Sequence, residues 1–228
     1  MPAAKLLEIA CFNMASAAVA QEAGADRIEL CENYNEGGLT PSQTLIAEAR
    51  QKISIPLHVI IRSRGGDFNY SEEEAEVMKS AVAFCRSQQV NGIVFGALDK
   101  SNNVDIQLCR DIIKLAGPMS FTFHRAIDQC KNIDLAMEQL IDLGVNRVLT
   151  SGGAGNVIQN ISKLKQLQNN YGRRIVIMPG GGLRASNIGQ VMPCGCPEYH
   201  SAAITGSAAV ADAEEIKKMK SFLGVSVL

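Results

Sequence analysis

The sequence predicts an α/β fold, namely a single (β/α)₈ barrel of the TIM type that spans residues 1–228. Three observations support this prediction. Eight aliphatic, β-branched segments alternate with eight segments of helical periodicity, each pair takes up about 28 residues, and no linker-like stretch divides the chain. An open doubly wound sheet usually has fewer strands and would interrupt this repeat.

The predicted strands are short apolar runs that follow a small-residue turn, a proline or a glycine. All eight have the length and composition of strands. In chain order they comprise residues 5–11, 24–31, 55–62, 89–96, 117–125, 144–151, 173–180 and 195–202.

Helical patterns fill the intervals between the strands, and several carry start signals. Thr40 precedes Pro41, so a capping residue is followed by the proline favoured at the first helical position. Ser71 and Glu74 have the spacing of a capping box. The predicted helices comprise residues 15–23, 41–51, 71–88, 105–116, 132–143, 157–169, 184–191 and 212–223.

The composition argues against several classes of protein. With 46% hydrophobic residues, 20% charged residues and a net charge of −1, the chain lacks the basic excess of nucleic-acid or anionic-membrane binders. No apolar run approaches the roughly 20 residues of a membrane span, and Glu8 interrupts the first apolar stretch too early for a signal peptide. Seven cysteines without the spacing of a disulfide framework predict reduced thiols and a cytoplasmic location.

Charged and histidine side chains occur in or at the ends of the predicted strands, and barrel enzymes carry their chemistry where the strands end. A charge in a strand buried on both faces is costly unless it is paired or faces a polar cavity. Five such residues would converge at one rim and predict a binding site there. They are Glu8, Glu29, Arg62, His124 and His200. The alternative is that arginines hold the two glutamates, which then take no part in chemistry.

Strand alternation orients two cysteines relative to the glutamates. If Glu29 points into the barrel, Cys31 does so too, two residues later. If Glu8 points into the barrel, Cys11 points toward the helices, unless the strand has already ended there.

Two glycine-rich turns, TSGGAGN after the sixth strand and PGGGL after the seventh, each lead into a predicted helix. Glycines there let backbone N–H groups approach a ligand, and a following helix N-terminus favours an anion. Thr150, Ser151, Gly180, Gly181 and Gly182 are therefore expected to bind substrate. A tight turn that needs positive φ is the alternative explanation for a glycine at these places.

The long loop RSRGGDFNYS after the third strand offers Arg64 and Asp67 to the mouth, and its two glycines suit a hinge. Arg62 and Arg64 suit a carboxylate or phosphate group, and Arg125 ends the fifth strand in the same way. If Arg62 points inward, His58 does too, one turn deeper, where a satisfied core histidine is expected.

Two kinds of metal site are compatible with the sequence. Cu(I) prefers thiolate ligands, and Cys11 and Cys31 end adjacent strands, where they meet at the rim if Cys11 breaks the alternation. Cys194 and Cys196 precede the last strand and therefore belong to the opposite, stability-bearing face. Two carboxylates and a histidine suit instead a harder divalent ion such as Mg²⁺ or Mn²⁺.

Seven segments of the sequence, in strict order, carry a family resemblance. They are ADRIELCENYNEGGLTPS, IRSRGGDFNYSEEEAEVM, GIVFGAL, FTFHRAID, RVLTSGG, RIVIMPGGG and YHSA. Together they resemble the CutC family, which is named for copper homeostasis, and the likeness runs from about Leu7 to Ala202. The resemblance implies a cytoplasmic TIM-barrel protein, often dimeric, that binds copper.

The resemblance also implies roles for single residues. The copper ligands proposed for the family fall on Cys11 and Cys31. Its rim residues fall on Glu8, Glu29, Arg62, Arg64, Asp67, His124, Arg125 and His200. The sequence departs from the family at Ser63, where proline is usual, and in the segment after Ala202, which is shorter than usual.

Two functional hypotheses follow, of which the first is the main prediction and the second the alternative. In the first, to which the resemblance leads, the protein serves copper homeostasis and holds Cu(I) through thiolates near the barrel mouth. In the second, drawn from the residues, it is an enzyme that acts on a small phosphorylated or carboxylated metabolite. The expected proton-transfer residues are Glu8, Glu29, His124 and His200, and the expected substrate-binding residues are Arg62, Arg64, Asp67, Arg125, Thr150, Ser151, Gly180, Gly181 and Gly182. A homodimer or higher homo-oligomer is expected in either case, and a scaffold with an idle mouth is a third alternative.

Overall fold

The computed structural model of the protein describes residues 5–206 and 209–224. All eight predicted strands are present, and each is shorter than its sequence pattern because the outer residues of each segment belong to the connections between elements. The strands are β1 (Leu6–Cys11), β2 (Arg27–Leu30), β3 (Leu57–Ile60), β4 (Gly92–Phe95), β5 (Ser120–Phe123), β6 (Arg147–Thr150), β7 (Val176–Pro179) and β8 (Glu198–Ser201).

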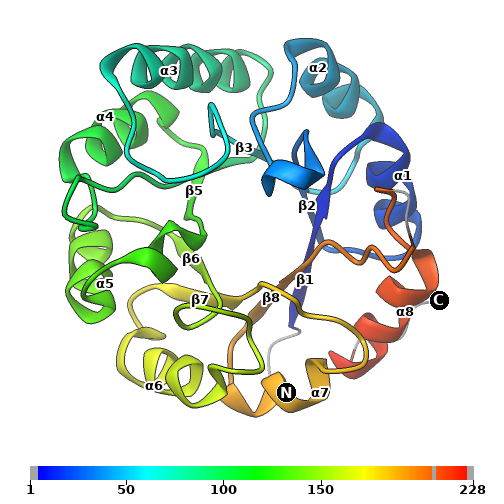
Figure 1. Cartoon of the computed structure of the whole chain (residues 1–228). Helices are drawn as coiled ribbons and strands as arrows, with labels where there is room; N and C mark the ends of the chain where they lie inside the picture. Colours follow the sequence, from blue (N-terminus) through cyan, green and yellow to red (C-terminus); the bar gives the residue numbers. More distant parts are fainter. Residues whose placement is uncertain (1–4, 207–208, 225–228) are drawn as a thin grey trace.

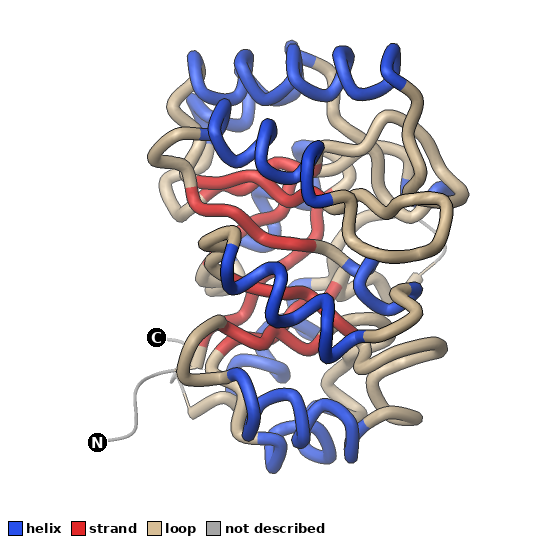
Figure 2. Tube along the Cα trace, turned by 90° about the vertical axis from the view of Figure 1, so that its left-hand side faces the viewer, coloured by secondary structure: helices blue, strands red, loops and turns tan. Residues whose placement is uncertain are grey.

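The strands form one parallel sheet that curls into a barrel, with the helices around it (Figure 1). Hydrogen-bonded neighbours follow the order β7-β6-β5-β4-β3-β2-β1-β8, and β7 and β8 lie against each other. Seen from the side, the strands lie at the centre with helices on either side (Figure 2). The predicted TIM-barrel fold is therefore confirmed.

The helices begin and end close to the predicted positions. The capping box at the start of the third helix is formed, with Ser71 N–H donating to Glu74 Oε2 at 2.8 Å and Glu74 N–H donating to Ser71 Oγ at 3.3 Å. The helices are α1 (Met14–Glu22), α2 (Gln43–Lys52), α3 (Glu72–Ser87), α4 (Ile106–Ala116), α5 (Ile133–Asp142), α6 (Ile161–Tyr171), α7 (Ile188–Val191) and α8 (Ala213–Phe222).

Two helices begin later than their sequence pattern, and each delay has a local cause. Asn156 Oδ1 accepts hydrogen bonds from the backbone N–H groups of Ile158 and Gln159, at 3.0 and 3.1 Å. Asn187 Oδ1 accepts one from Arg184 N–H at 2.8 Å. Such side-chain bonds stabilise a turn in place of a helical one. As a result α6 begins at Ile161, and α7 is reduced to a single turn that begins at Ile188.

Three short 3₁₀ helices have no counterpart in the predicted elements. They are η1 (Tyr34–Glu36), η2 (Arg125–Gln129) and η3 (Met192–Cys194). The first two belong to the connections that follow β2 and β5, so they lie at the end of the barrel where those strands finish.

The main hydrophobic core lies between the strands and the helices, and strand alternation decides which side chains enter it. In β1, Leu7, Ile9 and Cys11 belong to this core, whereas Glu8 and Ala10 point into the barrel. The barrel interior is therefore free to hold polar side chains. Among the described residues, no helix is both long enough and apolar enough to cross a membrane.

Candidate functional site

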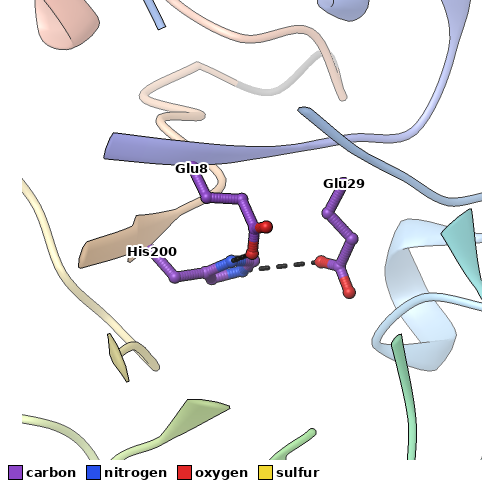
Figure 3. Close-up of side chains that lie close together, drawn as sticks. All are labelled: Glu8, Glu29 and His200. Carbon is purple, nitrogen blue, oxygen red and sulfur yellow. Dashed lines mark hydrogen bonds and ion pairs between the residues drawn. The ribbon is translucent and has the colours of Figure 1, made fainter. Parts of the chain in front are cut away.

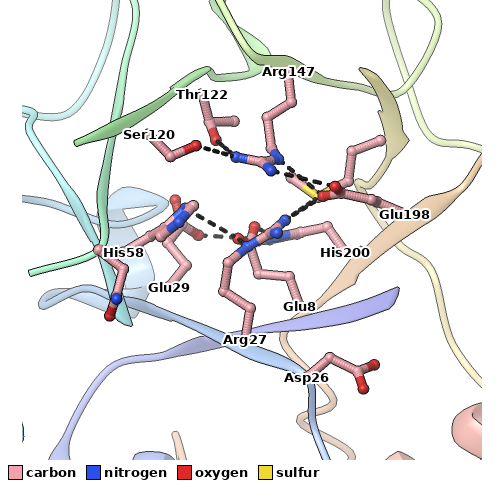
Figure 4. A network of polar contacts seen from close by, with 12 residues as sticks. Glu8, Asp26, Arg27, Glu29, His58, Ser120, Thr122, Arg147, Glu198 and His200 are labelled. Atoms are coloured by element: carbon pink, nitrogen blue, oxygen red, sulfur yellow. Dashed lines mark hydrogen bonds and ion pairs between the residues drawn. The ribbon is translucent and has the colours of Figure 1, made fainter. Parts of the chain in front are cut away.

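A network of buried ion pairs fills the part of the barrel nearest the beginnings of the strands (Figure 4). Arg27 donates hydrogen bonds to both Glu8 and Glu198. Arg147 donates to Glu198 as well, from Nε at 2.9 Å and from Nη2 at 3.2 Å. Each of these buried charges therefore has an opposite charge beside it, which offsets the cost of removing it from water.

Glu8, which belongs to this network, also begins a chain of contacts that runs through His200 to Glu29 (Figure 3). His200 Nδ1 lies 2.8 Å from Glu8 Oε1, and His200 Nε2 lies 3.6 Å from Glu29 Oε2. Glu8 comes from β1, Glu29 from β2 and His200 from β8, and Glu8 is the register partner of His200 in the β1–β8 ladder. The imidazole therefore bridges a carboxylate inside the network and a second carboxylate that faces the mouth.

The pKa values of these groups are displaced in different directions. Burial alone would raise the pKa of Glu8, but the Arg27 guanidinium and the contacts with His200 outweigh burial and hold that pKa well below its usual range. Burial opposes the charge on His200, but the hydrogen bond with Glu8 and the negative charges of Glu29 and Glu8 raise its pKa. Burial raises the pKa of Glu29 to about 7, against the opposing effect of His200. Glu8 is therefore ionised, whereas Glu29 exchanges its proton near neutral pH.

A cavity of about 320 Å³ opens above Glu29 and His200. Its walls come from the last residues of several strands and from the segments that follow β1, β2, β3, β5, β7 and β8, so the cavity lies at the end of the barrel where active sites of this fold occur. The volume suits a small metabolite.

Three arginines line this cavity, namely Arg62, Arg125 and Arg184. Arg125 also donates to Asp128 at 3.0 Å and to Ser151 Oγ at 3.1 Å, and its side chain is 43% exposed. Arg184 donates to Ser201 Oγ at 3.2 Å. Both guanidinium groups are thus held in position by neighbours while they border the cavity.

Arg62 lines the cavity but its guanidinium is occupied by backbone carbonyls. It donates to Glu36 O at 2.8 Å, to Gly38 O at 3.3 Å and to Gly66 O at 3.1 Å. The residue was expected to bind an anion, whereas these contacts tie the loop after β2 to the loop after β3.

The structure does not bring Arg64 and Asp67 to the cavity. Arg64 Nη2 donates to Asp67 Oδ1 at 2.9 Å, and Arg64 Nε donates to Glu74 Oε1 at 2.6 Å, at the start of α3. Both side chains are partly or largely exposed there. The loop after β3 therefore contributes Phe68 to the cavity wall instead.

The three consecutive glycines after β7 have different tasks. Gly181 and Gly182 line the cavity with φ values of 98° and 81°, and a Cβ at Gly181 would lie 2.9 Å from Arg125 Cζ. Within the described ranges, the N–H groups of Gly181 and Gly182 have no hydrogen-bond acceptor. Gly180 lies deeper, where a Cβ would meet Leu149 Cδ1 at 2.4 Å. Backbone donors are therefore available to a ligand at two of the three positions.

The helix N-terminus that was expected to assist an anion at this turn is missing. Because α7 has only one turn and begins at Ile188, six residues beyond Gly182, any anion here is bound by amides and arginines and not by a helix dipole.

Thr150 and Ser151 do not line the cavity. Thr150 Oγ1 and Ser151 Oγ both donate to the carboxylate of Asp128 in η2, the latter at 2.7 Å. Ser151 N–H donates to the same carboxylate at 3.0 Å. These residues therefore fix η2, and with it the position of Arg125.

His124 lines the cavity as a neutral group. Its Nδ1 accepts a hydrogen bond from Ala126 N–H at 3.2 Å, which assigns the proton to Nε2. Burial, together with the positive charge of Arg62, lowers the pKa of His124 to about 3. No described residue provides a hydrogen-bond partner for the buried Nε2. His124 is therefore a hydrogen-bond donor and not a base at neutral pH.

His58 lies deeper in the barrel than Arg62, as predicted, but it is not fully satisfied. Its Nδ1 lies 3.7 Å from Glu8 Oε2 and has no hydrogen-bond partner among the described residues. Burial lowers the pKa of His58 to about 3, so this imidazole is neutral.

The two cysteines expected to hold copper lie on adjacent strands but on opposite faces. Cys31 N–H donates to Cys11 O at 2.8 Å. Cys31 lines the cavity in a small cluster with Ile60 and Val94, whereas Cys11 belongs to the core on the helix side. Burial, with a further contribution from the negative charge of Glu29, raises the pKa of both thiols, so both are protonated.

One set of donor atoms in the cavity floor has the spacing of a metal site. One ligand atom from each of Glu8, Glu29 and His200 falls within 4.8 Å of the others. Two carboxylates and an imidazole suit Mg²⁺, Mn²⁺ or Zn²⁺, and copper(II) binds such nitrogen and oxygen donors more strongly than other divalent ions of its row. Glu8 already holds His200 Nδ1, which leaves Nε2 and Glu29 as the directly available donors.

Sequence reasoning missed Arg27, Arg147, Glu198 and Arg184. Arg27 and Glu198 each lie two residues before another inward-facing polar side chain, Glu29 and His200 respectively, whereas Arg147 precedes the apolar Leu149 and Arg184 lies outside the strands. Polar residues at positions i and i+2 of one short strand were therefore a signal that would have found Arg27 and Glu198, but not Arg147 or Arg184.

Comparison with known proteins places the chain among homologues. The family model described as the CutC family matches residues 5–205. A CutC family protein of Photorhabdus laumondii is 45% identical over 197 residues, which cover 86% of this chain and 79% of the relative. One of Chromobacterium violaceum is 44% identical over 200 residues, which cover 87% and 81% of the two chains.

Solved structures also include a similar protein of the CutC family. A CutC protein from Streptococcus agalactiae, named for copper homeostasis, is 30% identical with a TM-score of 0.83, over 88% of this chain and 100% of that one. Phosphoribosyl anthranilate isomerase from Thermotoga maritima has a TM-score of 0.63 at 14% identity, over 96% and 98% of the two chains. The second likeness concerns the barrel fold alone.

Proposed function

The chain belongs to the CutC family, and from that premise we propose that its barrel mouth is the active site of an enzyme that binds a small anionic metabolite and exchanges a proton with it. The observation that carries the proposal is the position of Glu29. Its carboxyl group borders the cavity, faces His200 Nε2 at 3.6 Å, and shares the cavity with three arginines.

The charges around the cavity favour an anion. Arg125 and Arg184 border it from the segments after β5 and β7, and so do Gly181 and Gly182, whose N–H groups have no acceptor among the described residues. Arginine forks and free backbone amides are the groups that proteins use for phosphate and carboxylate. His124 adds one neutral donor at Nε2.

The same cavity contains a group suited to proton transfer. Burial raises the pKa of Glu29 to about 7, so at neutral pH its protonated and ionised forms are both populated. General acid–base catalysis is most effective when the pKa of the catalytic group is near the working pH. Glu8 keeps His200 oriented through Nδ1, so His200 Nε2 is the second group able to take or give a proton.

The proposal is tested by titrating the full chain with inorganic phosphate in a calorimeter. We expect binding by the wild type, a loss of about tenfold or more in Arg184→Ala, because a charge-assisted hydrogen bond contributes about 1.5–3 kcal/mol, and no change in Arg174→Ala. Arg174 pairs with Glu138 on the outer surface and serves as the matched control. Absence of phosphate binding to the wild type overturns the proposal.

We propose copper binding as a second function, because a relative is named for copper homeostasis and Cys31 borders the cavity. A thiolate is the donor that Cu(I) prefers. Cys31 would be the first ligand and Cys11 the second, the latter after a rotation that brings its side chain to the cavity side of β1. Displacement of the thiol protons makes such binding pH-dependent.

Titration of reduced protein with Cu(I) against a competing chelator tests this second function. A Cys31→Ser variant is expected to lose affinity, and a Cys11→Ser variant shows whether the second thiolate takes part. Cys85→Ser, in α3 and away from the cavity, is the control. Unchanged affinity in the Cys11→Ser, Cys31→Ser double variant rules these ligands out. A cytoplasmic location and a homo-oligomeric state stay predictions.

A further inference from the structure

The cavity has two chemically different sides. In a barrel whose strands follow one another in order, β1 to β3 lie opposite β5 to β7, and Figure 1 shows this arrangement. The side after β5 and β7 carries Arg125, Arg184 and the amides of Gly181 and Gly182. The side after β1, β2 and β3 carries mainly aromatic and aliphatic groups, because its arginine, Arg62, donates to backbone carbonyls and Glu29 lies at the cavity floor. A ligand that spans the cavity therefore meets a polar end and a mainly apolar end.

The apolar side is built around two aromatic rings. Phe12 directly follows β1 and packs against the cluster of Cys31, Ile60 and Val94. Tyr34, in η1, meets Phe12 edge to face with ring centroids 5.0 Å apart and an interplanar angle of 77°. Both rings border the cavity.

Tyr34 is an exposed aromatic residue at the rim of the cavity. It is 42% exposed, and the other exposed large hydrophobic residues among those described belong to the outer helices. An aromatic ring exposed at the rim of a cavity is an available surface for a ligand.

The position of Tyr34 is fixed by contacts beneath it. Arg62 is buried, with 7% of its surface exposed. It donates to Glu36 O at 2.8 Å and to Gly38 O at 3.3 Å, at the end of η1. It also lies over the ring of Phe68 at 5.0 Å. A buried arginine therefore holds the aromatic side in place, so that the ring is offered to a ligand at a low entropic cost.

We propose that the ligand of this cavity is an anion that carries a planar, aromatic group. Its anionic end binds to Arg125, Arg184 and the amides of Gly181 and Gly182, and its ring stacks against Tyr34 and Phe12. The inference rests on the anion site proposed above and adds the class of compound that the site selects.

Calorimetric titration of the full chain with three probes tests this inference. The probes are inorganic phosphate, phenyl phosphate and cyclohexyl phosphate, of which the last has a similar size but no aromatic ring. We expect phenyl phosphate to bind roughly threefold to tenfold more tightly than cyclohexyl phosphate, which is the range expected from an aromatic pair.

Two variants locate the effect. Tyr34→Leu keeps an apolar side chain and is expected to remove the preference for phenyl over cyclohexyl phosphate while inorganic phosphate binds as before. Phe222→Leu, at an exposed position of α8, is the control and leaves the preference unchanged. If inorganic phosphate binds but phenyl phosphate has no advantage over cyclohexyl phosphate, or if Tyr34→Leu retains the advantage, this inference is overturned and the anion site stands. If neither inorganic phosphate nor the esters bind, both proposals fall.

Discussion

His200 Nδ1 lies 2.8 Å from Glu8 Oε1, although 192 residues separate the two in the sequence. The contact joins the first strand to the last and orients the imidazole, because Glu8 is itself fixed by Arg27. With Nδ1 occupied, Nε2 is the nitrogen directed at Glu29. Closure of the barrel thus brings His200 and Glu29 together at the cavity floor.

Glu8→Gln is expected to lower the pKa of His200, because the variant removes a hydrogen bond and a negative charge that favour the imidazolium. The raised pKa of His200 stabilises the fold below its ordinary pKa of 6.5, and this contribution is lost as pH rises through the folded-state value. Titration of the imidazole by NMR checks the shift. An unchanged His200 pKa in the variant would show that the contact does not control its charge.

The same variant is expected to lower the free energy of unfolding by about 1.5–3 kcal/mol, because the buried Arg27 loses one of its two carboxylate partners while Glu198 still pairs with it. Urea unfolding measures this change. Glu48→Gln, which breaks the exposed ion pair with Lys52, is the control and is expected to cost less than about 1 kcal/mol.

Binding of sulfate is expected to weaken as pH rises through 7. Burial raises the pKa of Glu29 to about 7, so this carboxyl is neutral below that pH and repels an anion above it. Sulfate keeps its charge throughout this range, so the change reports the protein. We expect a loss of about tenfold in affinity between pH 6 and pH 8 in the wild type, and a flat profile in Glu29→Gln. A wild-type profile that is also flat contradicts the assignment.

The sequence was sufficient to predict the barrel because the repeat of strand and helix is long-ranged and appears eight times. It was also sufficient to predict that Glu29 and His200 meet, since both lie near the ends of strands that a barrel brings together. It was not sufficient for the loops. Arg64 and Asp67 were expected at the mouth, but their charges pair with each other at the start of α3, a choice that depends on local geometry.

Arg62 illustrates a second limit. Its position at the end of β3 was predicted correctly, but the partners of its guanidinium are carbonyl groups of Glu36, Gly38 and Gly66. Every residue has a backbone carbonyl, so the pattern of side chains does not indicate which carbonyls accept a hydrogen bond from an arginine. The sequence therefore could not distinguish an arginine that binds a ligand from one that holds two loops together.

Stability at acidic pH is expected to depend on His124. Burial lowers its pKa from 6.5 to about 3, so stability is complete above the unfolded-state pKa and is lost as pH falls toward the folded-state value. At pH 5 this single group is expected to cost about 2 kcal/mol relative to pH 7. His124→Gln is expected to lose less stability over that interval, as measured by urea unfolding at each pH. Burial also lowers the pKa of His58 to about 3, so His58 maintains part of the acid sensitivity in the variant.

Gly96→Ala is expected to destabilise the protein by displacing the ring of His124. A Cβ at position 96 would lie 2.5 Å from His124 Nδ1 and 2.6 Å from Cε1, and the ring cannot retreat because Phe68 packs on it with centroids 4.8 Å apart. Overpacking of this kind costs about 1–3 kcal/mol, which thermal or urea unfolding measures directly.

Gly189→Ala is the matched control, because its Cβ would meet Phe222 at an ordinary 3.6 Å inside α7, where alanine is favoured over glycine by about 0.5–1 kcal/mol. If Gly96→Ala were as stable as Gly189→Ala, His124 would not be confined against the cavity wall, and its role as a fixed neutral donor would have to be abandoned.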